Sequence, residues 1–206
     1  MAIIVDKAQK RKDIALACKQ LIFQNGIRNL TVSQITQQAN IGKGTLYSYF
    51  KNKEEIVIEI INLLFTEHKI GLIKNLKNLD STLDKLKLFS TFFYDDEYIE
   101  IRELYKEFVS ILVIKQQDEF ADFKTKTFNT YYGLFKEVVV DAVNQGELKP
   151  EAVALSHGIF LTPEGMFISK LMRNDMQNLK AEINKYLEMI FYVLKSNNNT
   201  TSKIEK

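Results

Sequence analysis

The sequence predicts an all-α protein with a small N-terminal head of three helices and a larger helical body. Stretches with apolar residues every three or four positions fill most of the 206 residues, and this spacing is typical of helices that pack on one face. Only two prolines and eight glycines interrupt these stretches, and no turn dipeptide between alternating apolar runs indicates a β-hairpin. Residues 1–53 hold nine Lys and Arg against two Asp, although the whole chain has a net charge of only +2. This basic head suits a polyanionic partner such as DNA.

The first helix is predicted from about Lys7 to Asn25, after a loose arm of residues 1–6. Gly26 follows it, where helices commonly end with a residue in the left-handed conformation. Cys18 lies among the apolar positions and is interpreted as a small buried hydrophobe; as the only cysteine, it excludes an intramolecular disulfide. A basic cluster on the first turns is placed to approach phosphates: Lys7, Lys10, Arg11 and Lys12.

The stretch Thr31–Phe50 predicts two short helices joined by a tight turn. Thr31 is a good N-cap and Gln34 follows three residues later, which is the spacing of a capping box. Asn40 tolerates the left-handed conformation that ends a helix, and Ile41 can fill the corner between the two helices.

The second short helix is expected over about Lys43–Phe50. Leu46 and Phe50 are four residues apart and can both point inward. The other side chains would spread hydroxyls, aromatic rings and an ammonium over the outer surface: Lys43, Thr45, Tyr47, Ser48 and Tyr49. Two interpretations remain open on capping and periodicity alone. One is a helix-turn-helix whose second helix enters the DNA major groove, and the other is a pair of helices in an ordinary bundle.

Two segments, TVSQITQQANIGK from Thr31 and GTLYSYFKNKEEI from Gly44, closely resemble the signature of the TetR family of bacterial transcriptional repressors. The resemblance is strong from about Asp13 to Ile60 and beyond that concerns the overall plan only. The family's turn often reads Gly-Val-Ser, where this chain has Asn40-Ile41-Gly42. Gly42 therefore lacks a hydroxyl that could contact a phosphate.

The resemblance implies a ligand-responsive repressor that binds palindromic double-stranded operator DNA as a homodimer. It implies a helix-turn-helix DNA-binding domain over residues 1–53 and a helical effector-binding and dimerisation domain over 54–195. The polar composition of residues 196–206 predicts a disordered tail. It assigns DNA contacts, with Lys53 on the phosphate backbone, to Thr31, Ser33, Gln34, Lys43, Gly44, Thr45, Tyr47, Ser48, Tyr49 and Lys53.

The body is predicted to be a series of amphipathic helices. The first follows an N-cap at Asn52, with Glu55 completing a box-like arrangement, and runs to about Leu76. Gly146 is predicted to end a helix, and Pro163 should kink or break the helix that begins near Glu151. The other helices are expected at about Ser81–Tyr94, Glu97–Lys115, Glu119–Gln145 and, after an N-cap at Asp175, Met176–Lys195.

The last helix has a wide apolar surface. Met189, Tyr192 and Val193 widen a stripe that consists of Leu179, Ile183, Leu187, Ile190 and Leu194. A helix that is apolar on more than one face must be buried on more than one side. The family resemblance implies a dimer in which the last two long helices of each subunit form a four-helix bundle, with this stripe at the interface. The alternative is burial of the helix inside its own domain.

The middle helices are rich in aromatic residues, most of which are expected in the core. The resemblance implies an effector pocket there, which suits an apolar or aromatic compound, a fatty acyl species or a lipophilic drug. The candidate pocket residues are Phe108, Phe128, Tyr132, His157, Phe160 and Phe167.

No pattern of catalytic or metal-binding residues stands out. His68 and His157 have no partner at metal-ligand spacing, and the run from Gly42 to Thr45 lacks the first glycine of a P-loop. We therefore expect no enzyme activity, no cofactor and no metal. No stretch reaches membrane-spanning length, so a cytoplasmic protein is expected. The alternative function is a small-molecule binding or assembly module on the same fold without a transcriptional role.

Overall fold

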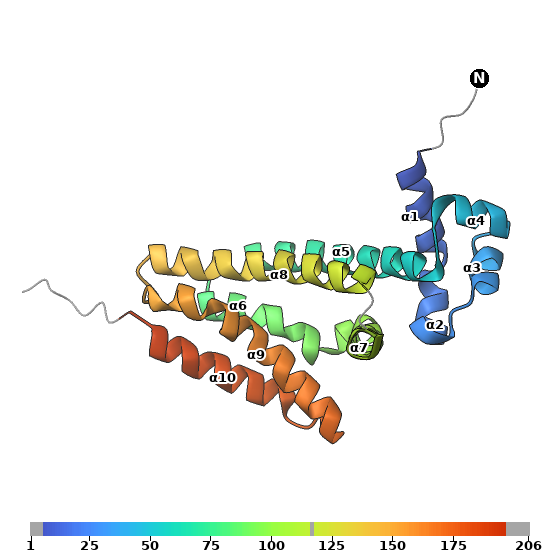
Figure 1. Cartoon of the computed structure of the whole chain (residues 1–206). Helices are drawn as coiled ribbons and strands as arrows, with labels where there is room; N and C mark the ends of the chain where they lie inside the picture. Colours follow the sequence, from blue (N-terminus) through green and yellow to red (C-terminus); the bar gives the residue numbers. More distant parts are fainter. Residues whose placement is uncertain (1–5, 116–117, 197–206) are drawn as a thin grey trace, which may run out of the picture. The chain divides into compact units, whose positions relative to one another are not determined.

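A computed structural model describes residues 6–115 and 118–196, and within these ranges the chain is helical with no strand (Figure 1). The elements are α1 (Lys7–Ala17), α2 (Lys19–Asn29), α3 (Val32–Gln38), α4 (Lys43–Tyr49), α5 (Lys53–Lys77), α6 (Thr82–Ser90), η1 (Thr91–Phe93), η2 (Asp96–Tyr98), α7 (Ile99–Lys115), α8 (Asp118–Asn144), α9 (Glu151–Arg173) and α10 (Leu179–Leu194). The all-α prediction is confirmed. The expected arm and tail fall almost wholly on residues 1–5 and 197–206, outside the described part. None of the described helices combines the length and apolarity needed to cross a bilayer.

The chain packs as two compact units. Unit 1 comprises Met1–Gly71 and Tyr98–Phe128, and unit 2 comprises Leu72–Glu97 and Asn129–Lys206. These packing units do not follow the expected boundary after residue 53. A functional division at residue 53 therefore stays a prediction.

The core of unit 1 lies between the short helices and α5. Its most deeply buried apolar side chains come from all five N-terminal helices and the links between them: Ile14, Cys18, Ile22, Leu30, Ile35, Leu46, Phe50, Ile56 and Ile60. The Cys18 thiol is fully buried, and this burial raises its pKa to about 11. Because the thiolate is the reactive form, Cys18 is an inert part of the core, as its apolar surroundings in the sequence indicated.

The N-terminal helix differs from the prediction in one respect. The expected single helix from Lys7 to Asn25 is two segments, α1 and α2, that meet at Cys18. The Asp6 carboxylate caps α1 by accepting hydrogen bonds from the Ala8 and Gln9 amides. Gly26 interrupts the last turn of α2 with φ +73° and ψ 173°, which is the predicted left-handed glycine.

The turn at Gly26 is held by a carboxylate from α7. The Ile27 amide donates a 2.7 Å hydrogen bond to Glu107 Oε2. A Cβ atom on Gly26 would collide with the same carboxylate. Glycine is therefore required here both for its backbone conformation and for the close approach of Glu107.

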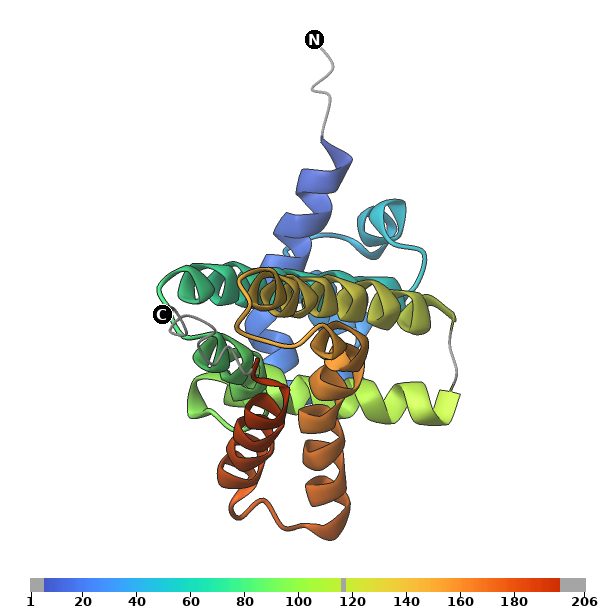
Figure 2. The same cartoon turned by 90° about the vertical axis from the view of Figure 1, so that its left-hand side faces the viewer.

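In unit 2, α10 packs against α9 and α6, and α9 and α10 lie side by side in Figures 1 and 2. Gly146, with φ +72°, ends α8 as predicted. The Lys149 amide donates to the Leu194 carbonyl at 2.8 Å, and the Ser196 amide donates to the Glu147 carbonyl at 2.9 Å. These two bonds tie the end of α10 to the α8–α9 turn.

The helices of unit 2 differ from the prediction in two places. The helix α9 continues through the buried Pro163, so the proline does not break it, and a kink there stays a prediction. Packing of the helix on both sides of the proline outweighs the loss of one backbone hydrogen bond. The last helix begins at Leu179 and not at Met176, because Asn178 is left-handed with φ +61°. Asp175 instead accepts a bond from the Gln177 amide within the preceding turn.

The loop between α9 and α10 is organised by a buried ammonium group. Lys170, only 5% exposed, donates to Glu182 Oε1 at 2.9 Å and to the Gln177 carbonyl at 3.1 Å. Asp175 lies 3.6 Å from the same nitrogen. A buried charge is stable only when it is paired and hydrogen-bonded, and these three groups satisfy it.

The apolar stripe of α10 also has a different role from the predicted one. Leu179, Ile183, Leu187 and Leu194 are 0–5% exposed within the subunit, so these four residues belong to its own core and are not available to a partner. Ile190 is partly buried. The apolar side chains that α10 leaves exposed are Met189, Tyr192 and Val193.

We predict that Gly26→Ala lowers the free energy of unfolding by about 1–2 kcal/mol, because alanine is strained at positive φ and its methyl group displaces Glu107. Gly71→Ala is the matched control. Its site in α5 has no atom near the added Cβ, so it should stabilise the protein by roughly 0.5–1 kcal/mol. Urea unfolding measures both, and an unchanged midpoint for Gly26→Ala would contradict the assigned constraint.

Candidate nucleic-acid interface

The helix α3 begins with the predicted capping box. The Gln34 amide donates to Thr31 Oγ1 at 3.3 Å, and the Thr31 amide donates to Gln34 Oε1 at 2.9 Å. The Thr31 hydroxyl also donates to Gln34 Oε1 at 2.7 Å, so its hydrogen is already engaged. Donors that remain for a phosphate at this end of α3 include uncapped backbone amides, the exposed Ser33 hydroxyl and the side-chain nitrogen of Gln34.

The turn between α3 and α4 has the expected conformation. Asn40 is left-handed with φ +51°, and the Ile41 amide donates to the Thr36 carbonyl at 3.0 Å. Ile41 is partly buried and packs against the core of unit 1. Gly42 is the N-cap of α4 and makes no side-chain cap.

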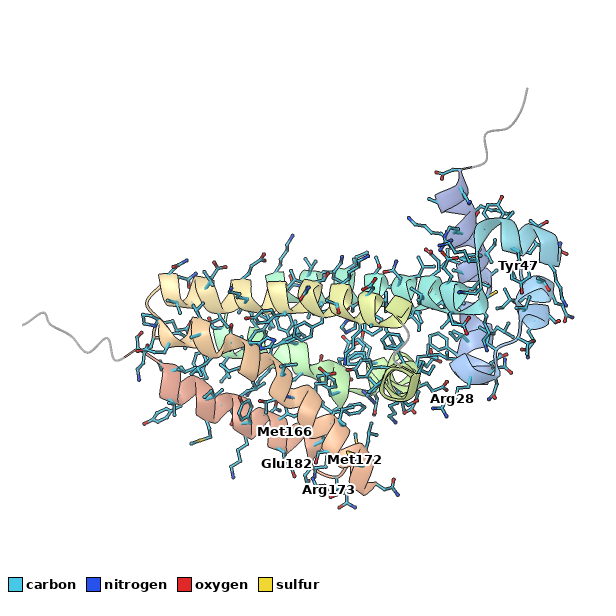
Figure 3. All side chains as sticks on the ribbon, in the orientation of Figure 1. Arg28, Tyr47, Met166, Met172, Arg173 and Glu182 are labelled. Atoms are coloured by element: carbon cyan, nitrogen blue, oxygen red, sulfur yellow. The ribbon has the colours of Figure 1, made fainter. Side chains whose placement is uncertain are left out.

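The helix α4 separates a buried face from a polar exposed one. Leu46 and Phe50 are 0% and 1% exposed, as predicted, whereas half of the Tyr47 side chain is exposed (Figure 3). Tyr49 differs from the expectation of an outer residue, because it is partly buried and packs against the core. The Ser48 hydroxyl donates to the Thr45 carbonyl at 2.6 Å and keeps its lone pairs for a donor group.

The ten candidate DNA-contacting residues fall into two groups. Those exposed on α3, α4 and the α3 cap are Thr31, Ser33, Lys43, Gly44, Thr45, Tyr47 and Ser48. Gln34, Tyr49 and Lys53 are partly buried. The Lys53 ammonium donates to the Arg28 carbonyl at 3.2 Å, which ties the first turn of α5 to the last turn of α2. Contact with DNA by any of the ten stays a prediction.

Arg11 does not lie with the exposed basic cluster to which its sequence position assigned it. Its guanidinium is directed into unit 1 and bonds Glu59 and the Tyr49 carbonyl, whereas Lys7 and Lys12 on the same helix are exposed. The sequence carries no signal for this role, since the partners of Arg11 lie 38 and 48 positions away along the chain.

The candidate effector residues do not all come together in the described contacts. In unit 2, the Tyr132 ring lies 5.1 Å from that of His157 and 5.7 Å from that of Phe160, and the Tyr132 hydroxyl is 3.0 Å from Ser156 Oγ. Phe167 is fully buried against Phe93. The other two candidates belong to unit 1, where Phe108 packs edge-on against Phe123, and Phe128 is partly buried. A pocket formed by all six stays untested.

The helix-turn-helix segment matches the family model "Bacterial regulatory proteins, tetR family" over residues 14–60. This range agrees with the stretch from Asp13 to Ile60 that carries the resemblance in the sequence. Over most of its length the chain is also similar to the fatty acid metabolism regulator protein of Bacillus subtilis. The two are 24% identical over 191 residues, which cover 89% of this chain and 95% of that protein.

Solved structures share the fold. A TetR-family transcriptional regulator from Cytophaga hutchinsonii superposes with a TM-score of 0.74 at 13% identity, covering 93% of this chain and 98% of that one. The transcriptional regulator FadR from Bacillus subtilis, solved in complex with stearoyl-CoA, superposes with a TM-score of 0.60 at 22% identity. The alignment covers 87% of this chain and 96% of FadR.

We predict that Tyr47→Ala weakens specific DNA binding by roughly ten- to a hundredfold, the range for loss of one base contact. The exposed Tyr47 ring packs little within the subunit, so the thermal midpoint of the variant should match that of the wild type. Fluorescence anisotropy on specific and random duplexes measures the affinity. An unfolded variant would instead assign Tyr47 to the core.

Lys53→Ala should weaken binding to every DNA sequence and lower the salt slope of the affinity by about one, as expected for loss of one phosphate contact. Lys53 also bonds the Arg28 carbonyl, so the unfolding midpoint of the Lys53→Ala variant must be measured in parallel. If the salt slope of Lys53→Ala equals that of the wild type and the variant is less stable, Lys53 only holds α2 to α5.

Proposed function

Because this chain belongs to the TetR family of transcriptional regulators, we propose that it is a repressor that binds a palindromic operator as a homodimer and is released by an apolar acyl effector. One observation supports DNA reading above all. The helix α4 buries Leu46 and Phe50 and turns Lys43, Thr45 and Tyr47 outward. An exposed set of donors and an aromatic ring on the second helix of such a pair suits the major groove.

The DNA contacts divide by chemistry. Tyr47, Thr45 and the lone pairs of Ser48 can meet base edges, since they combine hydroxyl groups with an apolar ring. Lys43, Lys53 and the amides at the start of α3 suit phosphates, which fix the register of the helix on the duplex. The surplus of positive charge in residues 1–53 supports this polyanionic partner. A DNA target places the protein in the bacterial cytoplasm.

The dimer contact is proposed on the outer faces of α9 and α10. Met172 is 83% exposed near the end of α9 (Figure 3), and Tyr192 is 76% exposed on α10 beside Met189 and Val193. Large apolar side chains with this exposure mark surfaces that other proteins cover. The interface therefore uses the face of α10 opposite the buried stripe, and a two-fold dimer would present two copies of α4 to successive half-sites.

The effector is proposed to be a long acyl chain in the aromatic part of unit 2. Phe89, Phe135 and Phe160 form a contiguous ring cluster, with Tyr132 and His157 as polar groups at its side. Such a combination of apolar walls and few polar anchors is typical of ligand pockets. Similarity to regulators whose names refer to fatty acid metabolism, one of them solved with stearoyl-CoA, supports an acyl thioester.

Within unit 1, the helix α7 is bonded to the turn at Gly26. It belongs to the same compact unit as α2, and its Glu107 holds the turn at Gly26 through the Ile27 amide. Arg28 in that turn also donates to Ser110 of α7 at 2.8 Å. We propose that effector binding shifts the population towards a dimer whose two N-terminal heads no longer match the operator half-sites.

The test is a gel-shift of the purified protein on the DNA upstream of its own gene, with a random duplex as control and a salt series for both. We expect specific binding about a thousandfold tighter than random binding. Stearoyl-CoA should release the DNA, whereas free CoA should not. If the protein binds both duplexes equally weakly, a selection from a random DNA library is the next step. Failure of that selection to yield a specific sequence would contradict the DNA-binding proposal.

For the dimer, we predict that Tyr192→Glu raises the dissociation constant at least about tenfold, because an unpaired charge would be buried in the contact. Lys136→Glu on α8 is the matched control, as an exposed charge reversal outside α9 and α10. Sedimentation equilibrium measures both variants. A dimer unaffected by Tyr192→Glu would place the interface elsewhere.

A further inference from the structure

Arg11 of α1 connects three helices of unit 1 at the end of the proposed recognition helix. Its Nη1 group donates to the Tyr49 carbonyl, the last residue of α4, at 2.6 Å. Nε and Nη2 both donate to Glu59 Oε2 on α5, at 3.2 and 3.1 Å. We propose that Arg11 is a positioning residue that fixes the orientation of α4 for DNA reading, and not a phosphate contact like its basic neighbours.

Three of the five N–H donors of the guanidinium are used by these hydrogen bonds. Its central carbon lies 4.3 Å from the centre of the Phe50 ring, and Nη1 is also 3.5 Å from Glu55 Oε1. Only 23% of the side chain is exposed. All three of its nitrogens donate to protein groups, and these contacts direct most of the side chain inward. By contrast, Lys12 is the next residue on the same helix and is exposed.

The helix α4 needs such support at its C-terminal end. It has only seven residues, far fewer than an isolated helix needs in water. Its N-cap, Gly42, supplies no side-chain hydrogen bond. A helix C-terminus carries unpaired carbonyls and partial negative charge, so a cation that bonds the last carbonyl stabilises it. Arg11 does this while Glu59 holds the guanidinium against α5.

The planar fork of arginine is required for this role. One guanidinium reaches Tyr49 and Glu59 in different directions and stacks on Phe50 at the same time. A lysine ammonium is a point charge without a planar face, so it cannot make all three contacts. Arg11→Lys therefore keeps the charge of the head and loses the geometry.

The consequence for DNA binding rests on the proposed operator-binding function. If Arg11 orients α4, Arg11→Met should weaken specific binding by roughly ten- to a hundredfold, the factor for loss of a charge-assisted hydrogen bond. Random-sequence binding should fall far less, and the salt slope should stay within half a unit of the wild type, because no phosphate contact is lost. Arg11→Lys should share the loss of specificity.

Lys12→Met is the matched control, since it removes the same charge from the same helix without touching α4 or α5. We expect it to lower specific and random binding alike. A slope reduced by about one in Arg11→Met would identify a phosphate ligand and overturn the proposal.

A second variant separates positioning from simple destabilisation. Removing Arg11 leaves the Glu59 carboxylate, only 18% exposed, without its main partner, which lowers stability. Arg11→Met with Glu59→Gln removes that unpaired charge. Its thermal midpoint should recover towards the wild type, whereas its specific affinity should remain low. Recovery of both would show that Arg11 acts only through stability.

Amide hydrogen exchange on the DNA-free protein tests the same contact without reference to any operator. Arg11→Met should speed exchange in the last turn of α4, including the Phe50 amide that bonds the Leu46 carbonyl. Exchange in α10 of unit 2 serves as the internal reference and should not change. Unaltered exchange in α4 would overturn the proposal. The wild type could also fail to bind any DNA specifically while exchange in α4 is still faster in Arg11→Met. That result would contradict only the operator-binding function.

Discussion

A seven-residue helix does not persist alone in water, and the surface that we propose for reading DNA depends on the core beneath α4. Leu46 and Phe50 are almost completely buried, and each such side chain contributes about 1.5–3 kcal/mol on leaving water. This burial stabilises α4 in addition to its own backbone hydrogen bonds. It also decides which of its residues remain outside, since a helix that turns Leu46 inward must turn Tyr47 outward.

Burial alone does not fix the orientation of a short helix, because the hydrophobic effect is non-directional. The orientation of the short helices comes from polar groups at their ends. Thr31 and Gln34 cap each other at the start of α3, Asn40 sets the turn, and Arg11 holds the last carbonyl of α4. Glu107 does the same for the turn at Gly26 inside α2. Each of these bonds is worth little in total stability, yet together they select one geometry among many with the same core.

In unit 2 the physical constraint is different. The helix α10 has apolar residues on nearly all sides, and one side is already satisfied by α6 and α9 within the subunit. The remaining side exposes Met189, Tyr192 and Val193. Burial of the first face explains how the subunit can fold, and exposure of the second explains why we propose a partner copy. The buried ammonium of Lys170 on α9 bonds Glu182 in the first turn of α10, which ties the two helices together beside their connecting loop.

The sequence by itself determined the helical fold, the capping box at Thr31, the left-handed residues Asn40 and Gly26, and the inward direction of Leu46 and Phe50. These features follow from local periodicity and backbone preferences, which act over a few residues. Only the tertiary structure decided that Arg11 faces inward, that Glu107 meets Gly26, and that the stripe of α10 from Leu179 to Leu194 is buried in its own subunit. It also decided that α9 continues through Pro163. Contacts between residues tens of positions apart leave no periodic pattern, and a charged or apolar face does not specify which neighbour will cover it.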